Sequence, residues 1–440
     1  MNTHQTPKQK HHMIEIFIKP EQKRSYFTLP FTMPENVETL TLAYHYDRAN
    51  LTTADGGFTA LEPVNTIDLG LIAPDGSQAG ASGSDKAEIS IGPTAATPGY
   101  RVVPLAPGEW QIMVGAYKVA PQGVKVTYDL TFTFKQPRWL RGDFHTHTLA
   151  SDGVLTAEEL GVHALRHGLD FLAVTDHNQF VSSDALPRIA GMTMIPGVEW
   201  THYEGHANFL GVNQPYDEPF PTQSMEETTA RFVSAMQRGA TIVINHPFDE
   251  GSGFKFDIHV LPFDCLEIWN GPMRESNLRA VGLWHSLLSA GGKVPIVGGS
   301  DYHRDNLFQI LGGPTTCVYC NSASAGDILE ALKKGHAYIV YASIGPSLEF
   351  RAGEAMMGDS VAWKPGMEMQ IEVDGLQPGD RVNLLTGRES QTMLISSSAG
   401  RLKTTASMPS RGFARIEVQR VFLPGIPPLP ALISNPIYFD

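Results

Sequence analysis

Seven short apolar runs between residues 143 and 319 constrain the fold of this chain more than any other feature of the sequence. Most of the runs end in His, Asp or Glu, and amphipathic segments separate them. The runs begin at Asp143, Phe171, Met194, Thr241, Cys265, Val294 and Thr315. Because strands that alternate with amphipathic helices are typical of βα units, the pattern predicts seven core strands in an α/β domain over residues 138–343.

Two of the intervening segments begin with helix-capping residues. Thr156-Ala-Glu-Glu159 has the form of a capping box, and Gly168 is suited to end the helix that follows it. A second capping box at residues 224–227 precedes a helix that is expected to end near Gly239. With a last helix over residues 325–334, these signals set the order of strands and helices along the domain.

The segments on either side of this domain have a different pattern. Apolar and polar side chains alternate over short stretches of residues 14–136, which predicts an N-terminal β-sandwich domain. Residues 1–13 carry nothing that could face a core and are expected to form a disordered tail. Short alternating strands return over residues 345–440 and predict a small C-terminal β-domain. A chain of 440 residues is therefore expected to be multidomain.

Charge and cysteine content exclude several classes of protein. The net charge of −13 argues against nucleic acid or an anionic membrane as the main partner, because such partners need a cationic surface. Three cysteines are too few for a disulfide scaffold, and no apolar run approaches the roughly 18 residues of a membrane span. We expect a soluble, cytoplasmic protein that acts on a small molecule. Homo-oligomer formation is left open.

Histidines concentrate in the α/β domain, and those near strand ends carry the functional signal. Eleven of the 16 histidines lie between His145 and His303. His145 and His147 are two residues apart on a strand, so both imidazoles project to one side. Five strands deliver such side chains to the carboxyl-terminal rim, where α/β barrels build their sites. The convergent positions are His145, His147, Asp152, His177, Glu199, His246, Asp301 and His303.

This number of imidazole and carboxylate groups indicates metal-ion chemistry. They are the ligands that Zn²⁺, Mn²⁺ or Fe²⁺ prefer, and a glutamate among histidines can bridge two ions. Such ions lower the pKa of bound water towards about 7 and polarise a substrate oxygen. The sequence therefore predicts a metal-dependent hydrolase that uses metal-activated hydroxide. Isolated core or surface histidines would not account for so many convergent positions.

The ordered motifs resemble those of the PHP (polymerase and histidinol phosphatase) family of metal-dependent phosphoesterases over residues 138–343. The motifs are Phe144-His-Thr-His147 with Ser151-Asp-Gly153, Ala173-Val-Thr-Asp-His177, Gly197-Val-Glu199, Asn245-His246 and Gly299-Ser-Asp-Tyr-His303. The resemblance implies a distorted seven-stranded TIM-like (β/α) barrel with two or three divalent ions. The flanking β-domain, Gly205-His-Ala-Asn208 and Ser434-Asn-Pro-Ile-Tyr438 are similar to the carbaryl-hydrolase-like branch, whose implied substrates need not be phosphates.

The resemblance also implies how these residues share the ions. His145, His147, Glu199 and Asp301 would surround one ion, and Asp152, His177, Glu199 and His303 a second. Glu199, His246 and one more histidine would hold a third. Asn208 stands where the commoner pattern has a histidine, so His206 is the expected substitute, with His202 behind it. The expected catalytic residues are Glu199, Asp301 and Arg304, and the expected substrate contacts are Arg304, Asn178 and Tyr302.

Other conspicuous residues have structural interpretations. Cys317 and Cys320 are spaced like half of a zinc ribbon, but no second pair follows, so packing is expected. His163 and His167 belong to an outer helix and are expected to be solvated or capping. The aromatic side chains of Trp200, Trp269 and Tyr302 could wall a substrate pocket or pack in the core. Arg304 could bind a phosphate or form a rim salt bridge.

A phosphoester is the favoured substrate class, and an amide, carbamate or ester is the alternative on the same site. Arg304 and the family's main activity favour phosphate, whereas the flanking domain and the few cationic side chains near the motifs favour the alternative. A non-catalytic binding module is a further alternative, although it should have lost ligands that this chain retains. A serine hydrolase is a weaker alternative still, because no Gly-x-Ser-x-Gly motif occurs.

Overall fold

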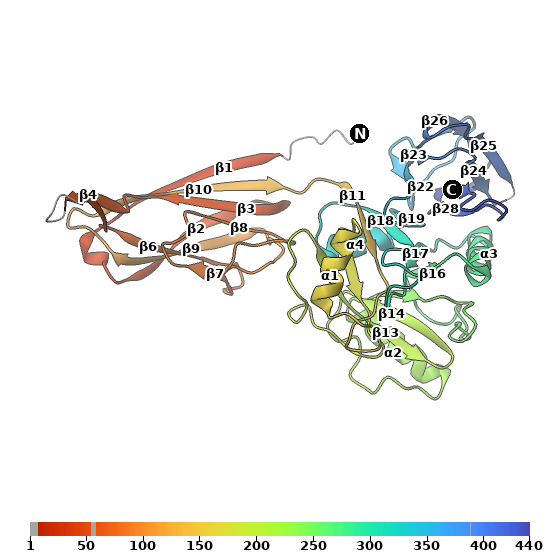
Figure 1. Cartoon of the computed structure of the whole chain (residues 1–440), viewed down its shortest axis with the longest axis horizontal. Helices are drawn as coiled ribbons and strands as arrows, with labels where there is room; N and C mark the ends of the chain where they lie inside the picture. Colours follow the sequence, from red (N-terminus) through yellow and green to blue (C-terminus); the bar gives the residue numbers. More distant parts are fainter. Residues whose placement is uncertain (1–7, 54–58, 388) are drawn as a thin grey trace. The chain divides into compact units, whose positions relative to one another are not determined.

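The computed structural model of the chain describes residues 8–53, 59–387 and 389–440. The chain divides into two compact units, Met1–Gln136 and Pro137–Asp440. The four α-helices of the described residues all belong to the second unit (Figure 1).

The first unit consists of two four-stranded antiparallel sheets around one core. Its strands are β1 (Gln9–Ile18), β2 (Tyr26–Met33), β3 (Val37–His45), β4 (Ala49–Thr53), β5 (Thr59–Pro63), β6 (Thr66–Ile72), β7 (Gln78–Ser82), β8 (Glu88–Ile91), β9 (Gly108–Lys118) and β10 (Val124–Phe134). One sheet has the order β1-β10-β3-β8 and the other β2-β9-β6-β7, while β4 and β5 pair with each other.

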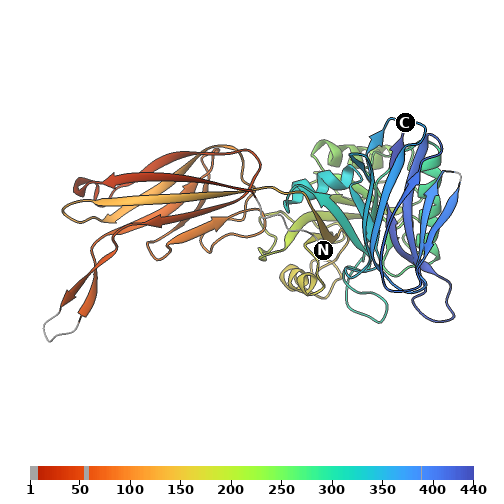
Figure 2. The same cartoon turned by 90° about the horizontal axis from the view of Figure 1, so that it is seen from above.

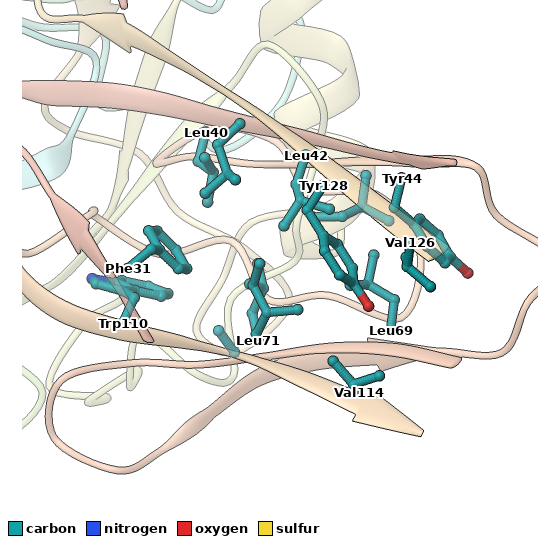
Figure 3. Close-up of a cluster of buried hydrophobic side chains, with 14 of the residues drawn as sticks. Phe31, Leu40, Leu42, Tyr44, Leu69, Leu71, Trp110, Val114, Val126 and Tyr128 are labelled. Atoms are coloured by element: carbon teal, nitrogen blue, oxygen red, sulfur yellow. The ribbon is translucent and has the colours of Figure 1, made fainter. Parts of the chain in front are cut away.

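The inner faces of both sheets contribute to the same hydrophobic cluster. Leu40 and Tyr128 come from one sheet, and Leu69 and Trp110 come from the other (Figure 3). Every second residue of β10 is buried, which is the period-2 pattern of a strand with one face on a core. Tyr128 and Tyr44 stack with ring centroids 5.8 Å apart.

The first strand includes residues 9–13, which were predicted to belong to a disordered tail over residues 1–13. β1 begins at Gln9 and pairs with β10 from Gln9↔Thr133 onward. Residues 9–13 are exposed, so the apolar pattern that marks a strand is missing there. Backbone pairing with a neighbouring strand needs no apolar side chain, and this explains the difference. Residues 1–7 of the expected tail lie outside the described residues.

The second unit begins with the segments that carry the predicted ligands. They are β11 (Arg138–Asp143), α1 (Ala157–Arg166), β12 (Phe171–Val174), β13 (Thr193–His202), β14 (Gly205–Leu210), α2 (Met225–Gln237), β15 (Thr241–Ile244), β16 (Cys265–Asn270), α3 (Glu275–Ser289), β17 (Ile296–Gly299), β18 (Thr315–Cys320), α4 (Ala325–Lys333) and β19 (Ala337–Val340). The sheet order is β17-β16-β15-β14-β13-β12-β11-β18-β19. β14 and β19 are additions to the seven predicted strands.

The two ends of this strand series approach each other. The backbone N–H of Gly298 in β17 donates to Thr316 Oγ1 in β18 at 2.9 Å, and the same hydroxyl donates to Gly298 O at 2.8 Å. Val243, Val297 and Val318, from three different strands, belong to one buried cluster. The sheet therefore curves around a common interior, with the carboxyl ends of its parallel strands at one rim.

The capping box at Thr156 is confirmed, whereas the one predicted at Ser224 is present only in its N-cap half, because Glu227 Oε2 accepts from Gln223 N instead of from Ser224 N. Thr156 Oγ1 accepts from Glu159 N at the start of α1, and Glu159 Oε2 accepts from Thr156 N. Ser224 caps α2 by accepting from the backbone N–H of residue 227. Gly168 and Gly239 follow the helix ends with φ of 74° and 89°, a conformation that glycine adopts without strain.

The C-terminal strands belong to the same compact unit as β11–β19, which corrects the predicted separate domain over residues 345–440. They are β20 (Ser347–Ala352), β21 (Ala355–Met356), β22 (Ser360–Val361), β23 (Glu368–Leu376), β24 (Arg381–Thr386), β25 (Ser390–Ile395), β26 (Gly400–Ser407), β27 (Gly412–Arg420), β28 (Leu429–Ser434) and β29 (Ile437–Phe439). β28 pairs with β19, so the C-terminal strands continue the sheet (Figure 2).

Side-chain bonds reinforce this continuity. Asn435 Oδ1 accepts from Ile296 N at 3.1 Å, and Asn435 Nδ2 donates to Ala337 O at 3.0 Å. Asn435 thus ties the C-terminal segment to both β17 and β19. Local alternation predicts the C-terminal strands but cannot reveal which sheet they join, because pairing depends on contacts distant in sequence.

Candidate metal centre

The structure brings all nine predicted metal ligands together in one cluster. Four groups of His, Asp and Glu side chains have candidate ligand atoms within 4.8 Å of one another. The groups are His147, Asp152, His177 and His303; His145, His246 and Asp301; His145, His147 and Glu199; and Glu199, His206 and His246. The shared members make the four groups one continuous cluster.

Glu199 lies at the centre of the cluster. Its Oε1 is 3.2 Å from His145 Nε2 and 3.2 Å from His206 Nδ1, and its Oε2 is 2.8 Å from His177 Nδ1. His147 and His246 also approach it, at 3.6 and 3.4 Å. The Glu199 side chain is only 1% exposed. One buried carboxylate therefore contacts five histidines.

Two aspartates hold the other side of the cluster. Asp301 Oδ1 lies 3.1 Å from His147 Nε2 and 3.4 Å from His145 Nε2. Asp152 Oδ1 lies 3.1 Å from His303 Nε2 and 3.6 Å from His177 Nε2. Asp152 comes from the loop between β11 and α1, whereas Asp301 follows β17. Loop residues therefore supply some of the candidate ligands, in addition to those on strands.

The electrostatics of the cluster favour positive charge at its centre. Burial by itself lowers the pKa of His145, but Asp301, Glu267 and Glu199 outweigh burial and raise the pKa well above its ordinary value. Burial likewise raises the pKa of Glu199 and Asp301, yet the neighbouring imidazoles hold both well below their usual range. These carboxylates are therefore ionised, and the field between them attracts a cation.

Several buried atoms test whether a metal ion fits. His145 Nε2, His147 Nε2 and Glu199 Oε2 are buried and make no hydrogen bond with any residue that the structure describes. The two imidazole nitrogens nevertheless lie within 3.1–3.6 Å of carboxylate oxygens. Unpaired donors and acceptors at this density are rare in protein interiors. A divalent ion such as Zn²⁺, Mn²⁺ or Fe²⁺ would satisfy them, so the donor set fits the implied cofactor.

Glu267, which the sequence analysis did not single out, orients two of the ligands. Glu267 Oε1 lies 3.0 Å from His145 Nδ1, and its Oε2 accepts from the backbone N–H of His246 at 2.9 Å. Because the carboxylate faces Nδ1, it keeps the proton there and leaves Nε2 of His145 free to bind an ion. The signal that could have found it is a charged residue inside an otherwise apolar strand.

Two further buried aspartates fix the loops that carry ligands. Asp143 accepts from the backbone N–H groups of His145, Ser300 and Gly312 at 3.0–3.1 Å. Burial raises the pKa of Asp143 to about 6. Asp176 Oδ1 accepts from Thr148 N, and its Oδ2 accepts from the Thr148 hydroxyl, both at 2.7 Å. Both aspartates follow or end a strand next to a ligand motif.

Asn208 supports Glu199 from behind, in the position where a histidine ligand is commoner. Asn208 Nδ2 donates to Phe144 O at 3.1 Å, and its Oδ1 accepts from Asn245 Nδ2 at 3.0 Å. Asn245 Nδ2 also donates to Glu199 Oε1 at 2.8 Å. Asn208 is therefore linked to Glu199 indirectly, through the side-chain amide of Asn245.

Of the two histidines that could replace this missing ligand, only His206 joins the cluster. His202 Nε2 instead lies 3.1 Å from Thr222 O, and its ring stacks on Trp200 with centroids 5.2 Å apart. His202 thus forms part of an adjoining wall.

Three site residues have left-handed backbone conformations. The φ angles are 52° at Asn178, 25° at His246 and 51° at Asp301. Such conformations cost non-glycine residues about 1–3 kcal/mol each and persist where neighbouring contacts hold them. The backbone N–H groups of Asn178 and His246 donate to Glu199 O and Glu267 Oε2, both at 2.9 Å. These hydrogen bonds therefore hold the backbone of Asn178 and His246 in the conformations that the site requires.

The three predicted substrate contacts are placed differently from one another. Asn178 lines a cavity beside the cluster, but its amide pairs with the backbone N–H and C=O of Thr201. The Tyr302 side chain is 1% exposed and packs with Leu160 and Leu169, so its ring faces the hydrophobic core rather than the cluster. Arg304 is exposed and lines a second cavity beside α1.

The cavity beside the cluster has a volume of about 960 Å³. His206 belongs to both the cavity and the cluster, so the cavity opens onto the candidate metal centre. Its lining includes the apolar side chains of Phe220, Met225 and Phe256, with Lys255 as a basic residue. Trp200 Nε1 donates to Phe220 O at 2.8 Å and fixes this wall.

The other conspicuous residues take structural positions. Cys317 and Cys320 are buried free thiols, as the packing interpretation predicts. His163 Nε2 lies 3.4 Å from Asp305 Oδ1, and neither side chain belongs to the metal-ligand groups. Trp200 and Trp269 are buried in one hydrophobic cluster. Within the described residues, no helix is long and apolar enough to span a membrane.

Comparisons with known proteins give partial matches. No family model matches the chain. Over 103 residues the chain is 34% identical to the 5′-3′ exoribonuclease Rnm of Salmonella typhimurium, covering 20% of this chain and 34% of that protein. The chain thus spans about a third of the length of this curated relative. Over 195 residues it is 26% identical to a protein described as a probable phosphatase of Tolumonas auensis, covering 37% of this chain and 77% of that protein.

A solved structure is also similar. It is a two-domain protein containing a predicted PHP-like metal-dependent phosphoesterase from Bacteroides vulgatus, with a TM-score of 0.40 and 17% identity. The match covers 68% of this chain and 95% of that chain. The carbaryl-hydrolase-like branch stays a prediction.

Proposed function

We propose that this protein is a metal-dependent hydrolase that cleaves a phosphoester of a small molecule, with two or three divalent ions at the cluster around Glu199. The single observation that carries the proposal is the buried carboxylate of Glu199 in contact with five histidines. If these ionisable groups had only a structural role, their buried charges would destabilise the fold without serving a function. The curated relatives named as an exoribonuclease and a phosphatase support the phosphoester.

The proposal gives each part of the chain a role. Glu199 bridges ions, Asp301 and Asp152 bind them from the other side, and His145 and His147 complete the central ligand set. Ions held there would lower the pKa of a bound water and polarise a substrate oxygen. The curved sheet of β11–β19 is proposed to be the distorted PHP-type barrel, and the first unit a β-sandwich that does no chemistry. The protein is proposed to act in the cytoplasm.

Hydrolysis of an amide, carbamate or ester is the second candidate on the same site. The apolar side chains of Phe220, Met225 and Phe256 in the adjoining cavity favour it, because they suit an uncharged group. Metal-ion chemistry would serve either bond. The ligand set is therefore common to both candidates, and the substrate contacts separate them.

The test is a substrate panel on the metal-loaded protein. Nitrophenyl phosphate, bis-nitrophenyl phosphate, nitrophenyl acetate and a nitrophenyl carbamate would be compared by kcat/KM after reconstitution with Zn²⁺, Mn²⁺ or Fe²⁺. We expect turnover of the phosphate substrates that depends on added metal. Faster turnover of the acetate or carbamate would favour the second candidate, and metal binding without turnover of any substrate would support a non-catalytic binding module.

A further inference from the structure

Within the described residues, the candidate ligand cluster consists of His, Asp and Glu side chains and includes no arginine or lysine. Within residues 8–53, 59–387 and 389–440, the ion pairs of Asp152, Glu199 and Asp301 all have histidine partners. An arginine or lysine at the rim would add to the positive charge that the metal ions offer to a substrate anion. Three basic side chains lie near the rim: Lys255, Arg274 and Arg304.

Arg274 reaches the ligand network through one intermediate side chain. Its Nη2 donates to Asn270 Oδ1 at 3.2 Å. Asn270 Nδ2 in turn donates to Asp301 Oδ2 at 3.3 Å and to Glu267 Oε2 at 3.2 Å. One residue, Asn270, thus lies between the guanidinium and a candidate metal ligand, and Arg274 is the residue that precedes α3.

The backbone that carries Arg274 is held in place. Asn277, which is 3% exposed, accepts from Asn270 N at 3.2 Å and donates to Asn270 O and Pro272 O at 3.0 Å. These bonds close the turn between the end of β16 and the first residue of α3. Because the turn is fixed, the guanidinium is positioned before any substrate binds.

The Arg274 side chain also bridges two ligand-bearing loops. Its Nη2 lies 3.3 Å from Asp249 Oδ1, and Asp249 N donates to His246 O at 2.9 Å. The side chain is 50% exposed. Its Nε and Nη1 groups make no polar contact with described residues, so they can donate to an anion. Asp249 orients the arginine without occupying all of its donors.

The other two cations are less well placed. Lys255 Nζ lies 3.7 Å from Glu204 and 3.4 Å from Tyr203 O, and its side chain is 61% exposed on the far wall of the cavity. Arg304 lies among α1 residues, together with Arg166. Among the described residues, neither side chain is linked to a candidate ligand by as few hydrogen bonds as Arg274 is.

We infer that Arg274 is the residue that binds the negatively charged oxygens of the substrate, and that the substrate class is a phosphate ester. The inference rests on the proposed function and deepens it. A guanidinium matches the spacing of phosphate oxygens, and its charge-assisted hydrogen bonds are about twice as strong as neutral ones.

The experiment compares Arg274→Ala, Arg274→Lys and the matched rim variant Arg304→Ala. We would measure kcat/KM for nitrophenyl phosphate and nitrophenyl acetate, bound metal per chain, and calorimetric binding of inorganic phosphate to the metal-loaded protein. Arg274→Ala should lower kcat/KM for the phosphate and the affinity for inorganic phosphate by about 10- to 100-fold, with a much smaller change for the acetate. Arg274→Lys should lose less, and Arg304→Ala, which removes the rival rim arginine, should lose less than Arg274→Ala on the phosphate substrate and on inorganic phosphate.

The outcomes separate this inference from the proposed function. Wild-type protein that binds inorganic phosphate through Arg274 but hydrolyses no ester would contradict the proposed function and support the anion site. Unchanged phosphate binding in Arg274→Ala, an equal loss in Arg304→Ala, or no phosphate binding by the wild type would overturn the anion site. Loss of metal in Arg274→Ala that Arg274→Lys does not restore would reassign Arg274 as a positioning residue and also overturn it.

Discussion

Glu267 Oε1 lies 3.0 Å from His145 Nδ1, and both side chains are fully buried. The pair is the only contact of the His145 ring with a carboxylate that is not itself a candidate ligand, within the described part of the chain. This relationship sets the tautomer of the first histidine of the site.

Glu267→Gln should therefore weaken metal binding while the fold remains. The NH₂ group of a glutamine facing Nδ1 would donate a hydrogen bond to that nitrogen instead of accepting one from it. The ring proton of His145 would then be on Nε2, and Nε2 could not bind an ion. Loss of such an orienting partner typically costs 10- to 100-fold in metal affinity, and we expect about that loss by calorimetric titration. Glu354→Gln, at an exposed position, is the matched control and should leave affinity unchanged.

Glu199→Gln should lower both bound metal and turnover by orders of magnitude. A neutral amide cannot balance the charge of two cations, and it would place donors against histidines that already face the centre. Elemental analysis of the purified variant checks the first effect, and circular dichroism checks that the fold is intact. Full metal occupancy with near-normal activity would remove Glu199 as the bridging ligand.

Removal of metal should destabilise the second unit. Ions that bind only the folded chain stabilise it by about 2.7 kcal/mol when free metal is 100 times the Kd. For a unit of this size we expect the Tm to fall by several degrees in the presence of a chelator and to recover when Mn²⁺ or Zn²⁺ is restored. An identical Tm with and without chelator, measured by scanning calorimetry, would argue against stabilisation of the second unit by metal ions.

Asn208→Ala should lower the free energy of unfolding by about 1–3 kcal/mol, because it leaves the Phe144 carbonyl without its Asn208 donor and Asn245 without one acceptor. Metal affinity should fall as well, since Asn245 holds Glu199. Asn213→Ala is the matched control, because that exposed amide makes a surface hydrogen bond with Ser183 N. Denaturant unfolding of both variants measures these free energies, and an equal loss in the two variants would contradict a special role for Asn208.

A protein of residues 137–343 alone should not fold cooperatively, whereas one of residues 137–440 should. The shorter chain loses β28, the partner of β19, and exposes Tyr338 and Val340, which pack with C-terminal residues. It also loses Asn435, which bonds to β17 and β19. Proton–nitrogen correlation spectra would show dispersed signals for the longer protein only. A well-dispersed spectrum of residues 137–343 would restore the separate C-terminal domain.

Local sequence patterns were sufficient for the features that depend on neighbouring residues. The capping box at Thr156 and the N-cap at Ser224 give the starts of α1 and α2, because a cap acts within one helical turn. The strand predicted to begin at Asp143 is an exception, because β11 ends at Asp143; His145 and His147 lie beyond it, with ring centroids 5.3 Å apart. The nine candidate ligands come from motifs at strand ends, and these residues are brought together in the structure.

Tertiary structure alone decided the features that depend on residues far apart in the chain. Glu267 looks like an ordinary strand residue, and only the curvature of the sheet brings it against His145. The choice between the two arginines is similar. Arg304 follows a ligand directly in sequence but lies beside α1, whereas Arg274 is 27 residues from Asp301 and reaches it through Asn270. Adjacency in a chain sets backbone distance, but the direction of each side chain is set by the packing around it.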